Sequence, residues 1–262
     1  MLIKNLSIII LNDRQDHIFH QALLSAAVAA EIIVFDQETD NDWPNLEKKL
    51  KKINPQLNFR LILRKKIIED FADLRNKAIK KVNTPWLMFL DSDEILSSKN
   101  LNTLAQLLKN NQVDGYLIRR VDYFHQKQLH FGETGRAYHL RLARTNKIKY
   151  LRPIHEIATV TGQVEKSNLI IKHFPHQNIS EFFNAINQYA QIEAIFRFTH
   201  NISRSKIKLI LETILYPESK FLLNYCLKLG FLDGFAGLTY ATLMSLHSLL
   251  VRIYLYEKYF LN

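Results

Sequence analysis

Glycine is scarce in this chain, and its distribution excludes several ways of binding a nucleotide. There are seven glycines among 262 residues, and none precedes Gly115. A dinucleotide-binding turn after the first strand, a Walker phosphate loop and the glycine-rich loop of nucleotidyltransferases all need glycine in that part of a chain. A nucleotide bound by the N-terminal half must therefore be held by side chains and a metal ion.

Cysteine is scarcer still, because Cys226 is the only one. An intramolecular disulfide and a cysteine-rich metal site are both excluded, and a reducing cytosol fits best. The chain starts directly with an apolar stretch and lacks the ordered segments of a secretion signal, so we expect a cytoplasmic protein. The spacing of His125, His130 and His139 matches no standard zinc-ligand pattern, and we expect them on the surface or in an acceptor groove.

Negative charge is in deficit. Lys and Arg number 35 against 25 Asp and Glu, which gives a formal net charge of +10. This balance favours an anionic partner such as a nucleoside diphosphate, an acidic membrane face or a nucleic acid. Hydrophobic residues make up 47% and charged residues 23% of the chain, so it folds rather than being disordered, into one or two domains.

The first 90 residues alternate between strand-like and helix-like patterns. Apolar runs predict strands at 6–11, 31–35, 59–63 and 86–90, with helices at about 14–29, 44–53 and 69–82 between them. This alternation predicts an α/β fold with a mostly parallel sheet and right-handed crossovers. A more irregular, mixed region follows, with strands expected at 116–121, near 137–144, at 154–160 and at 168–174, and the chain is mainly helical from about 180.

The helical tail contains 18 residues without a formal charge, from Gly234 to Val251. This length is near the lower limit for a membrane span, but five Ser, Thr and His residues reduce its hydrophobicity. The neighbouring residues 221–229 are amphipathic, and the side chains of Lys220 and Lys228 can reach toward lipid headgroups. Three interpretations stay open: two core helices packed on each other, a helix pair lying in a membrane interface, or a true span.

Acidic residues end two of the predicted strands. Asp36 closes the second, and Asp91, Asp93 and Glu94 follow the fourth. In open parallel sheets, ligands bind outside the carboxyl ends of the strands. Asp91 and Asp93 are two apart, so in extended backbone both side chains point the same way and suit Mg²⁺ or Mn²⁺. The alternative is a turn that caps the next helix.

Further segments follow one another in a recognisable order. The first two are the strand at 6–11 and Asp36. The later segments are residues 71–78, which contain Arg75-Asn76, residues 86–94, which end in Asp-Ser-Asp-Glu, and then residues 141–144, 153–156, 171–174, 187–189, 193–194 and 228–237. This series resembles the family 2 glycosyltransferases, which use nucleotide-sugar donors on a GT-A fold. Residues 141–144 and 153–156 are similar to a pair found in bacterial lipopolysaccharide-core glucosyltransferases of the WaaE type. The resemblance covers nearly the whole chain.

The resemblance implies a donor site with a divalent metal cofactor. Asp36 would hydrogen-bond the nucleoside, the uracil of a UDP-sugar, unless it only caps a turn. Asp91 and Asp93 would bind the ribose and the Mg²⁺ or Mn²⁺ that bridges the two phosphates. Arg75 would lie near the diphosphate, and Arg141 is expected among the donor-binding residues.

The arginine assignment has an alternative, in which Arg75 only pairs with Asp73 or Asp91. The catalytic base is expected at Glu156, beside His155, which would orient it or contact the phosphates. Inverting transfer needs one carboxylate to take the proton of the acceptor hydroxyl as it attacks the anomeric carbon. Glu133 is the second candidate, and the alternative for Glu156 is a surface position in a strand.

Departures from the family pattern limit these expectations. The donor loop after the second strand, residues 36–40, lacks the usual glycine, and Ala143 replaces an aromatic residue. No Gln-x-x-Arg-Trp motif follows, which favours transfer of a single sugar over processive polymerisation.

We therefore expect a GT-A domain at 1–175 and a helical extension at 176–262 that docks on the inner membrane face. The function expected is inverting, metal-dependent transfer of one hexose to a glycan or lipid-linked acceptor in cell-envelope polysaccharide or lipopolysaccharide synthesis. The competing hypothesis is a non-catalytic module that binds an anionic polymer or nucleotide. Nucleic acid is disfavoured, because no stripe of aromatic and basic residues is present.

Overall fold

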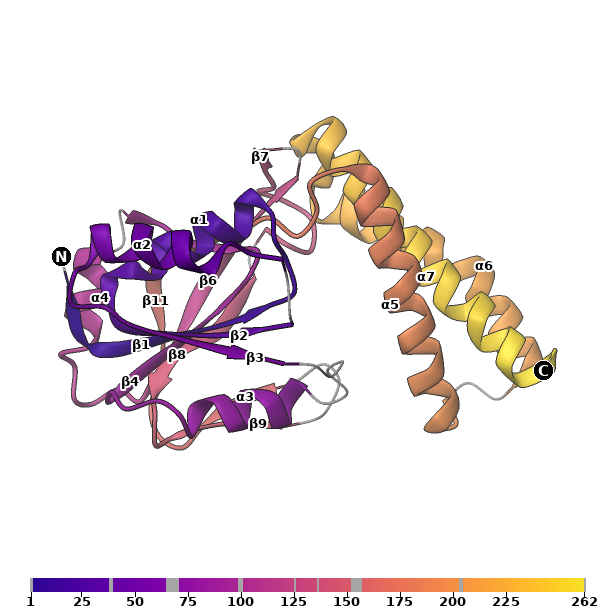
Figure 1. Ribbon diagram of the computed structural model, residues 1–262. Helices are drawn as coiled ribbons and strands as arrows, with labels where there is room; N and C mark the ends of the chain where they lie inside the picture. Colours follow the sequence, from indigo (N-terminus) through magenta and orange to yellow (C-terminus); the bar gives the residue numbers. More distant parts are fainter. Residues whose placement is uncertain are drawn as a thin grey trace. The chain divides into compact units, whose positions relative to one another are not determined.

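The computed structural model describes residues 2–37, 40–64, 71–98, 101–124, 126–135, 137–151, 157–202 and 205–261. The chain forms two compact units. The first comprises Met1–Arg120 and Tyr138–His173, and the second comprises Val121–Ala137 and Phe174–Asn262. Figure 1 shows the sheet with its covering helices and the long helices of the C-terminal part.

The first unit is built on a mixed sheet, and the predicted α/β class is confirmed. Within the described residues the strand order is β3-β2-β1-β4-β8-β6-β11-β5. Its parallel strands are β1 (Ile3–Asn12), β2 (Ala29–Asp36), β3 (Asn58–Leu63) and β4 (Trp86–Asp91). The remaining strands on this path are β8 (Tyr138–Arg144), β6 (Gly115–Phe124), β11 (Val164–His173) and the short β5 (Glu94–Leu96). β8 is antiparallel to both β4 and β6, and β5 is antiparallel to β11.

Two hydrophobic layers fix the sheet between helices. Ile8, Ile10 and Val34 face the layer that contains residues of α1 (His17–Ser25) and α2 (Trp43–Ile53), whereas Ile9 and Phe35 face α3 (Phe71–Ile79). In Figure 1, α1 and α2 cover one face of the sheet and α3 the other. Because the central strands are buried on both faces, their sequences are continuous apolar runs without polar alternation.

The helix expected at about 14–29 is shorter in the structure. Asp16 is the N-cap of α1, since its side chain accepts the Phe19 N–H at 2.9 Å, and the helix ends at Ser25. A 3₁₀ turn at Ala26–Val28 follows, and Ala29 already begins β2 opposite Ile3. Alanine favours helix locally, but strand pairing decides its conformation here. The helix expected at 69–82 is observed as α3, Phe71–Ile79, with residues 69–70 outside the described part.

Some elements carry no clear sequence pattern. They are β5, α4 (Leu101–Leu107), the two-residue β7 (Lys127–Gln128) and β9 (Ile148–Leu151). β9 pairs with β10 (Ile157–Val160) in a separate two-stranded sheet. The strand expected at 154–160 is therefore observed from Ile157, and its first residues lie outside the described part.

The second unit is helical, as expected from about residue 180. It contains α5 (Ile179–Thr199), α6 (Lys206–Leu222) and α7 (Phe235–Phe260), with a π-helical segment at Leu223–Leu227 and a 3₁₀ turn at Gly230–Asp233 between α6 and α7. α7 packs against both α5 and α6. Among the described helices, α7 alone is long and apolar enough to cross a membrane by length and composition, and 28% of its most apolar window is buried.

Candidate functional site

The carboxyl ends of β1, β2 and β4 bring polar side chains to one edge of the sheet. The strand register places Asn12 opposite Asp36 and Leu11 opposite Asp91. Asp36 is fully buried, and the Asn12 amide donates to its Oδ1 at 2.6 Å and to the Arg14 carbonyl at 2.8 Å. Asp36 thus lies at the strand end, as predicted, and its carboxylate is anchored by Asn12.

Asp91 is held by two arginines. Arg75 Nη2 donates to Oδ1 at 2.9 Å, and Arg141 Nη2 donates to Oδ2 at 2.5 Å. Burial opposes ionisation of Asp91, but the charges of Arg141 and Arg75 more than compensate and hold its pKa well below the usual range. Of the two pairings left open for Arg75, the structure has the one with Asp91, while Asp73 pairs with Lys77 at 2.6 Å.

Glu94 is part of the same ionic network, and the sequence analysis gave it no role. Its side chain is fully buried on β5, where Oε1 accepts from Arg141 Nη2 at 2.5 Å and Oε2 accepts the Asp91 N–H at 3.1 Å. Burial and the neighbouring Asp91 raise the pKa of Glu94, against the opposing charge of Arg141. The signal in the sequence was the position of Glu94 itself, an acid directly after Asp93 at the end of the fourth strand.

Arg75 and its neighbour Asn76 connect this network to β9. The guanidinium of Arg75 lies 4.9 Å from the ring centre of Phe89 and 5.3 Å from that of Tyr150. Asn76 donates to the Tyr150 carbonyl and accepts the Tyr150 N–H, both at 2.9 Å. The Arg-Asn pair therefore fixes both Asp91 and the strand that ends at Leu151.

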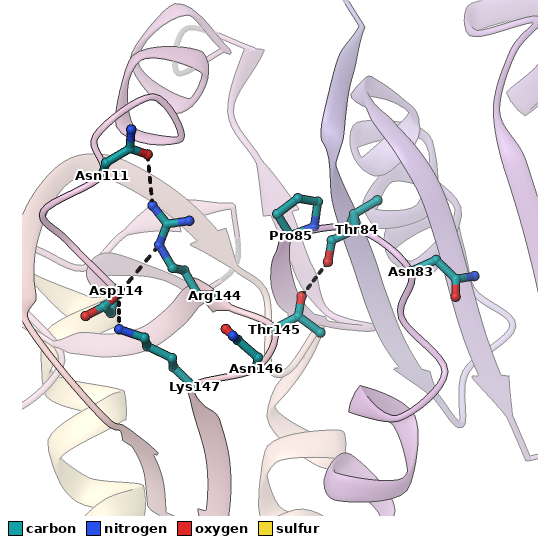
Figure 2. A pocket seen from close by; sticks show the side chains of 9 residues that line it. All are labelled: Asn83, Thr84, Pro85, Asn111, Asp114, Arg144, Thr145, Asn146 and Lys147. Atoms are coloured by element: carbon teal, nitrogen blue, oxygen red, sulfur yellow. Dashed lines mark hydrogen bonds and ion pairs between the residues drawn. The ribbon is translucent and has the colours of Figure 1, made fainter.

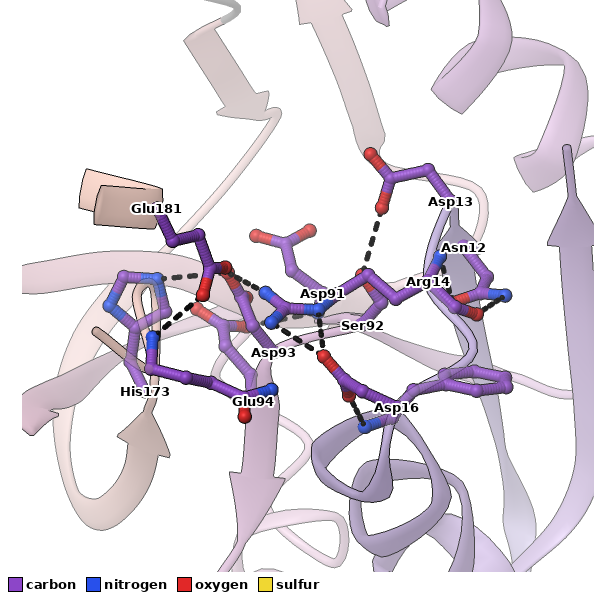
Figure 3. Close-up of polar contacts among 12 residues, drawn as sticks. Asn12, Asp13, Arg14, Asp16, Asp91, Ser92, Asp93, Glu94, His173 and Glu181 are labelled. Atoms are coloured by element: carbon purple, nitrogen blue, oxygen red, sulfur yellow. Dashed lines mark hydrogen bonds and ion pairs between the residues drawn. The ribbon is translucent and has the colours of Figure 1, made fainter. Parts of the chain in front are cut away.

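Asp93 has different partners from Asp91, although the two are only two residues apart. Asp93 lies in the turn after β4, where its Oδ2 is 3.5 Å from His173 Nε2 and 3.8 Å from Arg14 Nη1 (Figure 3). Burial acts against ionisation of Asp93, but the adjacent His173 lowers its pKa on balance. His173 reaches this position because it pairs with Glu94 in the register of β11 and β5.

Metal binding was tested on the side chains present. Within the described part of the chain, no group of three or more His, Cys, Asp and Glu side chains surrounds a common metal position. Asp91 is turned to the arginines, whereas Asp93 and His173 offer one carboxylate oxygen and one imidazole nitrogen side by side. These two side chains form an ion pair with each other, and a divalent cation at Asp93 stays a prediction.

Arg64 is a further basic residue at the same edge, and the sequence analysis missed it. It directly follows β3, and its backbone N–H donates to the Asp36 carbonyl at 2.8 Å. Its Nε and Nη2 atoms are buried and have no hydrogen-bond partner among the described residues. Burial lowers the pKa of Arg64, while the nearby Asp13 and Asp36 oppose that shift. The signal in the sequence was a basic residue at the carboxyl end of the third parallel strand.

The residues expected to act as the base are placed as follows. His155 and Glu156 lie outside the described residues, directly after β9 in the chain, so their roles stay predictions. Glu133, the second candidate, belongs to the second unit and forms an ion pair with Lys220. His130 lies 3.6 Å from Asp233 in that unit, His139 is in β8 of the first unit, and His125 is not described.

A polar hollow of about 510 Å³ lies at the opposite, amino-terminal end of β4 (Figure 2). Its lining includes Arg144 and Lys147, which both pair with Asp114, at 3.5 and 2.9 Å. The Arg144 guanidinium also lies 4.7 Å from the ring centre of Trp86. Its charged groups are thus satisfied within the protein, and it is separate from the acids at the strand ends.

A model of the family described as Glycosyl transferase family 2 matches residues 16–170, more than half of the chain. The chain belongs to this family. The matched segment of this glycosyltransferase includes Asp36, the Asp91 network and the stretch 152–156. The subgroup expected from 141–144 and 153–156 stays a prediction. No curated protein sequence matches this glycosyltransferase significantly.

Solved structures similar to this glycosyltransferase include S. aureus TarS 1–349 in complex with UDP-GlcNAc. It is 13% identical with a TM-score of 0.47, over 97% of this chain and 91% of that chain. A longer S. aureus TarS chain is 16% identical with a TM-score of 0.47, over 97% of this chain and 55% of that one. The mannosyltransferase PcManGT from Pyrobaculum calidifontis, in complex with GDP-Man and Mn²⁺, is 14% identical with a TM-score of 0.35. That match covers 43% of this chain and 34% of PcManGT, so the chain spans about a third of its length.

Proposed function

We propose that this protein transfers a single hexose, with inversion, from a UDP-sugar to a glycan or lipid-linked acceptor. The enzyme would act in cell-envelope polysaccharide or lipopolysaccharide synthesis, at the cytoplasmic face of the inner membrane. The observation that carries the proposal is the cluster of anchored acids and arginines at the carboxyl ends of the parallel strands, where open α/β sheets bind ligands. Membership of glycosyl transferase family 2 gives the reaction class.

The donor is held in this proposal by side chains, as the absence of early glycines requires. Asp36, fixed by Asn12, binds the nucleoside, and Arg64 offers two unpartnered nitrogens for diphosphate oxygens. Asp91 keeps acceptor capacity for a ribose hydroxyl, because a carboxylate has about four lone-pair sites and its arginines use two of them.

Asp93 and His173 would hold the divalent cation, which when bound neutralises charge on the departing diphosphate. Glu156 would take the proton of the acceptor hydroxyl, and His155 would orient that carboxylate. The Asn76–Tyr150 hydrogen bonds support this assignment, since they fix the strand from which residues 152–156 continue.

Substitution of Asp93 tests the donor site. Calorimetric titration of UDP into the purified protein should give metal-dependent binding with Mn²⁺ that Asp93→Asn weakens about tenfold or more, because one anionic ligand is lost. Asp73→Asn is the matched control, since that acid is exposed and pairs with Lys77 on the same helix. Unchanged UDP binding by Asp93→Asn would refute the metal assignment. Absence of UDP binding to the unsubstituted protein would favour a non-catalytic module or another nucleotide.

Substitution of Glu156 tests the base separately. Glu156→Gln should lower transfer about 10²–10⁴-fold, the usual contribution of a positioned general base, and leave the UDP affinity unchanged. Transfer is measured as acceptor-dependent release of UDP, with Glu133→Gln as the comparison. Full activity of Glu156→Gln together with loss in Glu133→Gln would move the role to Glu133.

A further inference from the structure

Helix α6 exposes an aliphatic stripe instead of burying it. Ile207, Ile210, Leu211, Ile214 and Leu215 are 43–73% exposed, and their spacing of three and four residues places them on one helix face. A row of large aliphatic side chains in contact with water is unfavourable, and contiguous patches of this kind mark interaction surfaces.

Two charged side chains of α6, Glu212 and Lys220, pair with residues of the same unit. Lys220 forms an ion pair with Glu133, and Glu212 lies 3.9 Å from Arg252 of α7. The guanidinium of Arg252 is buried and lies 3.8 Å from the ring centre of Tyr216. The unit thus buries one arginine against α6 while the aliphatic stripe of α6 stays exposed.

Large apolar side chains are also exposed in the turn between α6 and α7 and at its two ends. They are 43–77% exposed: Leu222, Leu227, Leu229, Phe231, Leu232 and Phe235. This turn is firmly held, because buried Asp233 accepts the N–H groups of His130 and Phe131 at 3.0 Å, and Lys127 donates to the Asp233 carbonyl at 2.7 Å. The apolar side chains are therefore presented by a fixed scaffold.

We propose that the face of α6 formed by Ile207, Ile210, Leu211, Ile214 and Leu215, together with this turn, docks on an anionic lipid bilayer. The exposed charged residues of α6 and of the turn are mostly basic, with Lys206 and Lys208 at the start of α6 and Lys228 in the turn, against Glu218 alone among the acids. Aliphatic side chains flanked by lysines match the acyl boundary and anionic headgroups of a bilayer. This surface belongs to the helical unit and is independent of the donor site.

A second copy of the chain fits this surface less well. In a symmetric antiparallel pair of α6 helices centred on the stripe, Lys208 lies opposite the apolar Ile214 of the other copy, and in a parallel pair each lysine faces itself. Like charges in contact oppose association. A membrane-spanning α6 is also excluded, because five of its 17 residues are charged. The helix therefore lies in the interface plane.

Vesicle binding by the full chain tests this proposal. The protein should float with phosphatidylethanolamine–phosphatidylglycerol vesicles and not with phosphatidylcholine vesicles, and Ile210→Gln/Ile214→Gln should weaken flotation about tenfold or more. Ile195→Gln, a change at a similarly exposed position on α5, is the matched control and should float normally. Lys206→Glu/Lys208→Glu should also weaken binding, with a loss that shrinks at high salt.

Several results would overturn the proposal. The first two are flotation of Ile210→Gln/Ile214→Gln at the wild-type level and no flotation of the unsubstituted protein. The third is a dimer, seen by light scattering, that Ile210→Gln/Ile214→Gln converts to a monomer. The fourth is retention of the protein in membranes after alkaline carbonate extraction, which would indicate that α7 spans the bilayer. Both variants should keep wild-type UDP binding and thermal unfolding. The membrane surface and the donor site therefore fail in distinguishable ways.

Discussion

At the scale of single residues, Arg141 is the centre of the candidate site. Its Nη2 reaches both Asp91 and Glu94, and those two acids with Arg75 form a network of four charges with little access to solvent. In such a network, removal of one member costs more than the pair itself contributes, because a buried charge is left without compensation. The network also sets the direction of the Asp91 carboxylate.

Replacement of Arg141 tests this account. Arg141→Met should lower the free energy of unfolding by about 3 kcal/mol or more, since Asp91 and Glu94 then face each other with less positive charge. Urea denaturation measures the change. Arg144→Met is the control in the same strand and should cost less, because Lys147 stays beside Asp114 and compensates its charge. Equal losses in the two variants would contradict a buried network.

At the scale of elements, the turn between β10 and β11 depends on one glycine. Gly162 has φ of +128°, and a Cβ there would come within 1.9 Å of Asp114 Oδ2. Asp114 in turn accepts the Gln163 N–H at 3.2 Å and pairs with Lys147. The absence of a side chain therefore allows the turn to close onto the start of β6.

Gly162→Ala should destabilise the first unit by about 2 kcal/mol or more, through backbone strain and displacement of Asp114. Gly132→Ala provides the comparison: Gly132 also has positive φ, at +74°, but its nearest neighbour to a new Cβ is 3.9 Å away. It should cost about 1 kcal/mol. Thermal unfolding of both variants separates steric clash from positive φ, and a smaller loss for Gly162→Ala would refute the clash.

At the scale of the whole molecule, residues 121–137 are an excursion from the sheet that belongs to the helical unit. Asp233, only 3% exposed, accepts the N–H groups of His130 and Phe131 and so joins this excursion to the start of α7. The glycines nearby allow the close approach, because a Cβ on Gly237 would lie 2.0 Å from the Gly230 carbonyl oxygen. Close backbone packing thus explains why the 228–237 segment contains glycines.

Asp233→Ala should release this excursion while the sheet stays intact. Two backbone donors lose their acceptor, so amide hydrogen exchange at 127–135 should accelerate at least about tenfold. Exchange in β1 and β4 should not change. Glu218→Gln, at an exposed acid on α6, is the control. Uniform acceleration across both units would show that they unfold as one.

Much of the fold follows from local patterns. Continuous apolar runs identified β1, β2, β3 and β4, because a strand buried on both faces needs no polar alternation. The strand-end acids Asp36 and Asp91 were found for the same reason, since parallel strands carry their ligands at one edge. Helix ends were less accurate: residues 26–30 favour helix by composition, but pairing with β1 makes Ala29 a strand residue.

The sequence by itself determined the alternating α/β order, the helical tail and the acids at the strand ends. Each of these depends on neighbours within a few residues. Only the tertiary structure decided that Arg141 joins Asp91 to Glu94, that His173 lies beside Asp93 and that α6 turns its aliphatic face outward. These depend on partners 47 to 87 residues away in the chain, and which side of an amphipathic helix is covered is set by the elements that pack on it.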